Sequence, residues 1–371
     1  MITDLDPILK EAEPNTRIEL GPGLHTTYGC GTGDRPDGPE LKQGCELIGH
    51  ESGTTVIMCI RPMTEEAGDA SVIRGQGENV VANLTVDGGV PLPEAGQTAT
   101  PYPRKRNLVF LKGDDNVIVD VTGRRQYGIY ADGRESFGLS CWGKSTISNC
   151  KVLDVVGTYA TAMQAHALEW CEVTFPRLRE GERGNFRAAF NMGDTDGGTV
   201  SNCQAYWAMA GIYTDWKDCR NLTVTDCLFH GVETGLYINA EERPGQTDAD
   251  SRCNENIEFV GNKVYLDPER PNLNGVLIDH RRSDDHKIET KQHCVNDVLI
   301  EENEFDFLPG EMKAKSKYAL NVFTATPAAK RTDRLGVSGI NYRNNVTHPA
   351  LEFRWIGDTD SKISKLNLIL E

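Results

Sequence analysis

One short segment recurs along most of the chain and constrains the fold more than any other feature. Its third position holds a thiol or an amide, at Cys150, Cys171, Cys203, Cys227, Asn262, Asn303 and Asn345. Upstream, Asn83 and Asp120 fit the same position. A residue type that returns at one point of every repeat is typical of a solenoid, whose repeats bury a core only by stacking. The pattern therefore predicts a stack of similar coils.

A run of β-forming residues accompanies the recurring segments and alternates between two faces. Because successive strand residues point to opposite sides, one set is predicted to face the interior. This inward column comprises Ile129, Met163, Phe190, Ile212, Leu236, Val276, Leu320 and Leu351. The residues predicted to face outward are Tyr130, Gln164, Asn191, Tyr213, Tyr237, Leu277, Asn321 and Glu352, and two positions further on Asp132, His166, Asp215, Asn239, Asp279 and Arg354. The outward set forms a polar and aromatic strip, where we expect the function to lie.

The charge and hydropathy of the chain exclude two classes of partner. The 371 residues carry a formal net charge of −16, whereas nucleic acids and anionic membranes both need a basic face. No apolar run approaches the roughly 18 residues that span a bilayer. We therefore expect neither nucleic acid nor membrane as a partner, and the sequence leaves an oligomer open.

The 11 cysteines are predicted to be mostly small interior side chains rather than disulfide partners. Four of them share the recurring position, where a thiol packs as a small hydrophobe. Their odd total and the absence of a signal-peptide pattern at the first residue favour reduced thiols, and a cytoplasmic location if the chain is complete. No C-x-x-C pair exists, so no structural zinc site is expected.

The whole chain, 1–371, is predicted to be one domain. Residues 1–14 form an N-terminal cap helix, because Leu5, Ile8 and Leu9 make an apolar stripe after the capping candidates Asp4 and Asp6. Such a helix would cover the open end of the first coil. Residues 15–371 form the stacked coils, and the Gly-, Pro-, Asp- and Arg-rich stretches between them form long loops. Long loops on a rigid scaffold commonly carry function.

The sequence resembles the pectin-lyase-like superfamily over residues 15–371. The resemblance rests on these coils and on two segments, Arg17-Ile-Glu-Leu-Gly-Pro-Gly and Gly49-His-Glu-Ser-Gly-Thr-Thr-Val-Ile. The resemblance implies an all-β fold, a single-stranded right-handed parallel β-helix of three sheets with an N-terminal capping helix. It also implies action on a polysaccharide in a groove along one sheet. The superfamily includes glycoside hydrolases, polysaccharide lyases, uronate epimerases and phage tailspikes, and one fold of this kind hosts many reactions. The reaction motifs of polygalacturonases and mannuronan epimerases are absent from this sequence.

The outward strip favours glycoside cleavage by two carboxylates. Coils stack about 4.8 Å apart, so outward residues two coils apart lie about 10 Å apart. A pair of carboxyl groups roughly 5 to 10 Å apart is what acid/base glycoside hydrolysis requires. The predicted catalytic residues are Asp215 and Asp194, with Asp279 and Glu241 in reserve. The predicted sugar-binding residues are Tyr213, Tyr237, Asn191, Asn239, His166, His280, Arg281 and Tyr130.

Two other functions use the same strip. A polysaccharide lyase or uronate epimerase would use His166, His280, Arg281 and Tyr237 to neutralise a uronate carboxylate and remove its C5 proton. A non-catalytic glycan-binding or tailspike-like protein would need only the open polar and aromatic surface. In all three cases the expected partner is a poly- or oligosaccharide.

No metal or cofactor is expected. The acidic and histidine residues from Asp279 to Cys294 have no diagnostic ligand spacing, so a polar loop is the favoured interpretation. The segment Asp194-Thr-Asp-Gly-Gly resembles the start of a calcium loop but lacks its remaining ligands. A bound calcium ion is therefore possible without being indicated.

Overall fold

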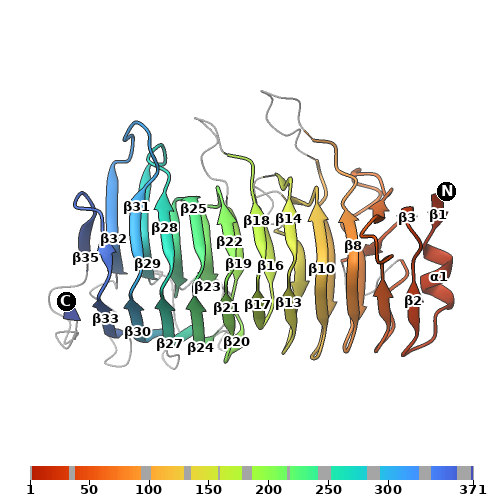
Figure 1. Cartoon of the computed structure of the whole chain (residues 1–371), viewed down its shortest axis with the longest axis horizontal. Helices are drawn as coiled ribbons and strands as arrows, with labels where there is room; N and C mark the ends of the chain where they lie inside the picture. The colour runs from red at the N-terminus through yellow and green to blue at the C-terminus, as the bar shows by residue number, and fades with distance from the viewer. Residues whose placement is uncertain are drawn as a thin grey trace. The chain divides into compact units, whose positions relative to one another are not determined.

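The computed structural model is built almost entirely of β-strands (Figure 1). It divides into two compact units, Met1–Ala189 and Phe190–Glu371. It describes residues 2–32, 38–92, 102–128, 135–157, 159–177, 186–214, 218–240, 252–281, 293–325, 336–356 and 369–370. Within these ranges no helix is long and apolar enough to cross a membrane. The expectation of a single domain stays a prediction.

In each unit the strands alternate along the chain between two sheets, which we call the ladder sheet and the second sheet. In unit 1 the ladder sheet contains β1 (Ile2–Asp4), β2 (Arg17–Glu19), β3 (Gly23–Thr27), β5 (Glu46–Ile48), β6 (Thr55–Cys59), β8 (Val80–Asp87), β10 (Val117–Arg124), β13 (Thr146–Ser148), β14 (Lys151–Leu153), β17 (Ala167–Glu169) and β18 (Glu172–Thr174). Its second sheet contains β4 (Cys30–Gly31), β7 (Ala70–Gln76), β9 (Arg106–Lys112), β11 (Tyr127–Gly128), β12 (Ser136–Cys141), β15 (Val156–Gly157) and β16 (Tyr159–Gln164). The pairings are parallel apart from β4 with β7 and β11 with β9.

Unit 2 repeats this arrangement with parallel pairings. The ladder sheet contains β20 (Thr195–Asp196), β21 (Thr199–Ser201), β22 (Gln204–Tyr206), β24 (Cys219–Thr225), β25 (Leu228–Val232), β27 (Arg252–Val260), β28 (Lys263–Leu266), β30 (His293–Glu301), β31 (Glu304–Phe307), β33 (Gly336–Arg343), β34 (Val346–Thr347) and β36 (Ile369–Leu370). Its second sheet contains β23 (Ala210–Thr214), β26 (Thr234–Asn239), β29 (Asn272–Arg281), β32 (Ser316–Ala325) and β35 (Glu352–Ile356). The strand β19 (Phe186–Asn191) runs across the boundary between the units. The predicted fold class, an all-β right-handed parallel β-helix, is confirmed.

The recurring thiols and amides line the interior, as predicted. Cys150, Cys171, Cys203 and Cys227 are all buried and free of disulfides. Burial raises the pKa of the Cys150 thiol, so this group is protonated at neutral pH. The side chain of Asn303 donates to Phe259 O at 2.8 Å, and its Oδ1 accepts from Asn262 N at 2.9 Å. Each amide thus pairs backbone groups at a turn of its own coil or of the coil beside it.

The assignment of Asn83 and Asp120 to this interior position is wrong by one residue. Both have left-handed backbone conformations, with φ of 55° and 54°. Because Val119 pairs with Ser148, Asp120 lies opposite Asn149, which precedes the interior position and is also left-handed. Asn and Asp tolerate this conformation better than other side chains, so two adjacent positions of the turn share one residue preference. Val121 occupies the interior position, where its amide donates to Cys150 Sγ at 3.4 Å.

The inward column is buried where the structure describes it. Met163, Phe190, Ile212, Leu236, Val276, Leu320 and Leu351 are all buried, whereas Ile129 lies outside the described residues. Register confirms that Ile212, Leu236, Val276 and Leu320 follow one another across neighbouring strands. The last member is an error, because Leu320 pairs with Phe353 rather than with Leu351. The register of β32 and β35 shifts between Tyr318 and Leu320, which sequence alternation alone does not reveal.

A short helix, α1 (Asp6–Glu11), lies within the segment predicted to form the cap. Leu5 and Leu9 are buried, while Ile8 is exposed, so the apolar stripe is narrower than predicted. Residues 2–4 form β1, which pairs with β3, so the helix begins later than expected. Its function as a cap for the first coil stays a prediction.

Candidate functional site

The second sheet of unit 2 brings several of the predicted site residues together. Tyr213 of β23 pairs in register with Tyr237 of β26, and Asn239 of β26 pairs with Asp279 of β29. Parallel strands in register place equivalent side chains on neighbouring levels about 4.8 Å apart. The four side chains form what we call the strip cluster.

Hydrogen bonds and a ring contact connect the strip cluster. Tyr237 Oη donates to Asp279 Oδ2 at 3.1 Å, and Asn239 Nδ2 donates to Tyr213 Oη at 2.8 Å. The two tyrosine rings meet edge to face with centroids 5.1 Å apart. The cluster therefore combines two phenols, one amide and one carboxyl group across three successive strands.

Four of the predicted outward site residues are buried rather than exposed, which corrects the prediction for them. Asn191 is 1% exposed, Tyr213 and Asn239 are each 3% exposed, and Asp279 is 5% exposed. Only Tyr237 is half-buried among the cluster residues. Alternation along a strand determines which way a side chain points but not what packs against it, and rings on neighbouring levels cover one another. A carboxyl group in such surroundings interacts strongly with nearby charges and dipoles.

Two of the predicted site residues near β19 serve a turn. Asn191 Oδ1 accepts a bond from Gly193 N at 2.9 Å, which is a local turn contact. Asp194 is exposed and has a left-handed backbone with φ of 65°. Their geometry is that of a strand-ending turn, and a catalytic role for Asp194 stays a prediction.

The other predicted residues divide between described and undescribed parts of the chain. His280 is buried next to Asp279, and Arg281 ends β29. His166 is half-buried in unit 1, outside the unit that holds the strip cluster. Asp215, Glu241 and Tyr130 lie outside the described residues.

Sequence reasoning missed a perturbed carboxyl group at the corner between β25 and β26. Burial raises the pKa of Glu233 to about 7, although the positive charge of Arg270 acts in the opposite direction. Arg270 Nε also lies 3.7 Å from Oδ2 of the buried Asp267. Perturbed carboxyl groups often mark functional sites, but structural ion-pair networks produce them too. No sequence pattern distinguishes Glu233 from an ordinary turn residue.

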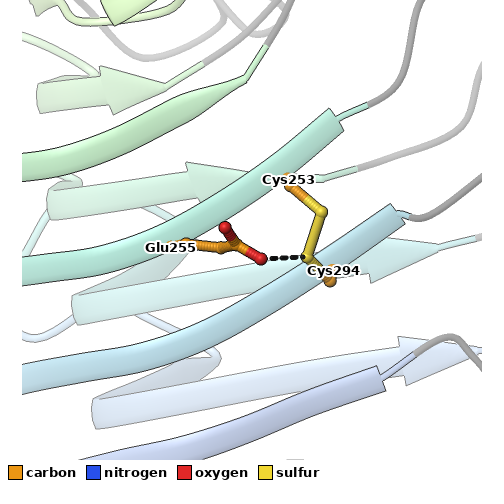
Figure 2. Close-up of side chains that lie close together, drawn as sticks. All are labelled: Cys253, Glu255 and Cys294. Carbon is orange, nitrogen blue, oxygen red and sulfur yellow. Dashed lines mark hydrogen bonds between the residues drawn. A yellow bond between two sulfur atoms is a disulfide. The ribbon is translucent and has the colours of Figure 1, made fainter. Parts of the chain in front are cut away.

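The expectation of reduced thiols is wrong for one pair. Cys253 of β27 and Cys294 of β30 form a disulfide, with Cα atoms 4.6 Å apart (Figure 2). They occupy directly opposite positions of neighbouring strands, so their side chains meet. The pair lies away from the recurring interior position, and its recognition from sequence would have required the register of the two strands.

Comparisons with known proteins show a likeness of fold. No family model matches the chain, and no curated protein matches it. A mutant tailspike protein of E. coli bacteriophage HK620, solved in complex with a pentasaccharide, superimposes with a TM-score of 0.53 at 12% identity, over 90% of this chain and 60% of that chain. A second mutant of this tailspike with the pentasaccharide gives a TM-score of 0.50 at 13% identity and the same coverage. The chain thus spans about 60% of the length of the tailspike.

A lower TM-score of 0.49, at 14% identity, relates the chain to the A-module of the mannuronan C-5 epimerase AlgE6 from Azotobacter vinelandii, over 90% of this chain and 87% of that chain. At identities this low, the likeness shows a shared backbone fold and carries no information on the reaction. The likeness shows a parallel β-helix fold, in which the structure has two sheets rather than the three expected, because strands on both sides of the ladder turn, such as β13 and β14, belong to one sheet.

Proposed function

We propose that unit 2 binds a poly- or oligosaccharide along its second sheet and cleaves a glycosidic bond by carboxylate acid/base chemistry. Asp279 is the proposed acting carboxyl group. The observation that carries the proposal is the hydrogen bond from Tyr237 Oη to Asp279 Oδ2, beside the bond between Asn239 and Tyr213. The fold does not require these contacts, because parallel strands pair through their backbones.

The chemistry of the strip cluster suits a sugar. Tyrosine rings offer apolar faces and a polar hydroxyl, which match the two aspects of a pyranose ring. Amide and phenol groups supply directional hydrogen bonds to sugar hydroxyls. The phenol of Tyr237 fixes the orientation of the Asp279 carboxyl group, as a catalytic acid or base requires.

A second carboxyl group is needed on the other side of the scissile bond. Asp215 is our first candidate because it follows β23, the strand beside the Tyr237 and Asn239 strand. Glu241 is the next candidate, because it comes shortly after Asn239 at the end of β26. The tailspike that shares the fold was solved with a bound pentasaccharide, which supports a glycan as the ligand.

Elimination or epimerisation of a uronate is the second candidate function. The buried His280 follows Asp279 directly, and Arg281 comes next at the end of β29. An imidazole, a guanidinium group and a phenol supply a base and a positive charge for a uronate carboxylate. The same strip cluster would then bind a uronate-containing polymer.

A polysaccharide panel tests the proposal. The chain is incubated with neutral, acetylated and uronate-containing polymers, and new reducing ends are counted alongside the absorbance of unsaturated uronate. Hydrolysis produces reducing ends without the absorbance, elimination produces both, and a glycan-binding protein produces neither while retaining the polymer in a pull-down. The proposal would be overturned if the chain neither cleaved nor retained any of the polymers.

The variant Tyr237→Phe assigns any activity to the strip cluster. It keeps the ring and removes the bond to Asp279, so we expect turnover to fall at least about tenfold. Tyr265→Phe is a matched control, because Tyr265 Oη donates to Glu304 Oε1 at 2.9 Å on the ladder sheet of the same unit. Equal losses in both variants would show that phenol–carboxylate pairs support the fold and not the reaction.

A further inference from the structure

The disulfide between Cys253 and Cys294 lies beside a carboxylate that is directed at its sulfurs. Glu255 is two residues after Cys253 in β27, so the two side chains share one face of the strand. Its Oε1 atom lies 3.3 Å from Cys294 Sγ (Figure 2). The two sulfurs and a carboxylate oxygen of Glu255 all lie within 4.8 Å of one another. Three metal-binding atoms therefore converge from two neighbouring strands.

Among the residues that the structure describes, the polar partners of Glu255 lie at long distances. Besides the sulfur, its oxygens meet Asn296 Nδ2 at 3.5 Å and Arg220 Nε at 3.6 Å. A disulfide sulfur carries no proton that a carboxylate can accept. In the oxidised protein the carboxylate thus lies at the sulfurs with only these two long contacts to donors.

We propose that Cys253, Cys294 and Glu255 bind a divalent zinc-class metal ion when the disulfide is reduced. Thiolates and carboxylates are established zinc ligands, and zinc prefers four ligands in a tetrahedron. Because the Glu255 side chain is 38% exposed, solvent reaches the site and supplies water as the fourth ligand. Oxidised, the pair is a cross-link between β27 and β30; reduced, it is a metal site at the same place.

The geometry suits this ion. Zn–S and Zn–O distances of about 2.3 and 2.1 Å place a sulfur and an oxygen ligand about 3.6 Å apart in a tetrahedron. The present separation of Cys294 Sγ and Glu255 Oε1 is 3.3 Å. Two sulfur ligands lie about 3.8 Å apart in such a site, so the thiols need only relax from bonding distance to contact distance.

The reaction balances with a phosphine as reductant. The Sγ–Sγ bond breaks, and two thiols form with the two protons of one water molecule. The phosphine takes the oxygen of that water and becomes a phosphine oxide. Binding of the metal then releases both thiol protons to solvent. The nearby Asp218, whose Oδ1 accepts from Cys253 N at 2.8 Å, adds negative charge, while Arg220 opposes the cation. The opposing guanidinium sets a moderate rather than a very tight affinity.

Equilibrium dialysis of the full chain against zinc tests the proposal, with bound metal measured by atomic emission. We expect the phosphine-reduced protein to bind one more zinc ion per chain than the oxidised protein. Reduced Glu255→Gln should bind this ion at least about tenfold more weakly. Zinc should also raise the melting temperature of the reduced protein only, because a ligand of the folded state stabilises it.

Cys294→Ser should abolish the redox-dependent zinc, whereas Cys227→Ala is the matched control and should retain it. Cys227 is a buried free thiol at the interior position. Equal zinc binding by oxidised and reduced protein, or full binding by reduced Cys294→Ser, would overturn the proposal. If Cys294→Ser does not fold, the oxidised and reduced wild type and the half-exposed Glu255→Gln variant still decide the question.

Discussion

The interior ladder and the strip cluster are both buried, polar and hydrogen-bonded between neighbouring coils, yet they differ in what their bonds satisfy. In the ladder, Asn303 bonds to the side chains of Asn262 and Asn345, and it also donates to the backbone oxygen of Phe259 and accepts from the backbone nitrogen of Asn262. In the strip cluster, Tyr237 and Asp279 bond side chain to side chain. Side chains that pair backbone groups are needed for the fold, because a buried unpaired backbone group costs free energy. The two strip-cluster bonds pair no backbone group, and we explain them by ligand binding.

The largest stability effect is expected in the ladder. Asn303→Ala leaves Phe259 O and Asn262 N without their side-chain partner, and we expect a loss of about 3 kcal/mol in the free energy of unfolding. Urea unfolding followed by circular dichroism measures this loss. A loss below about 1 kcal/mol would show that the amide is dispensable and would contradict a structural role for the ladder.

The pH dependence of stability tests Glu233, a half-buried carboxyl group that belongs to neither set. The pKa of Glu233 is raised to about 7 from its ordinary value of 4.5, so the folded protein binds a proton more readily than the unfolded chain. Stability should therefore fall as pH rises between these two values, by about 3 kcal/mol at most. Glu233→Gln should flatten this part of the profile. An unchanged profile in this variant would contradict the raised pKa of Glu233.

A smaller effect is expected where a thiol replaces the amide in the ladder. Cys227 Sγ contacts Thr225 O at 3.2 Å and Val200 O at 3.7 Å, and a thiol is only a weak donor. We expect Cys227→Ala to lower the free energy of unfolding by about 1 kcal/mol, mostly through lost packing. A loss equal to that of Asn303→Ala would show that thiols and amides are equivalent in the ladder.

Sequence periodicity predicted what repeats in every coil. The interior thiols and amides and the inward column from Met163 to Leu320 recur with a constant chemistry, because each coil must bury the same surface. The prediction failed where two adjacent turn positions accept the same residues, at Asn83 and Asp120. It failed again at Leu351, where the register shift before Leu320 breaks the alternation.

The candidate site was only partly predictable. Tyr213, Tyr237, Asn239 and Asp279 were identified because they share outward positions of successive coils, and register places them together. Their burial did not follow from alternation, since a strand pattern carries no information about the side chains that cover it. Glu233 and the bond between Cys253 and Cys294 depend on neighbours distant in sequence, so no local pattern indicated them.

Asp279→Asn gives the most direct test of the distinction between the two sets, with turnover and the free energy of unfolding measured on one sample. On the substrate found in the panel, we expect turnover to fall by about a thousandfold or more, because the variant loses an acid/base group. Stability should change by no more than about 1 kcal/mol, and Glu304→Gln, at the matched phenol–carboxylate pair, should leave turnover intact. Full turnover in Asp279→Asn, or a stability loss as large as that of Asn303→Ala, would contradict a functional role for the strip cluster.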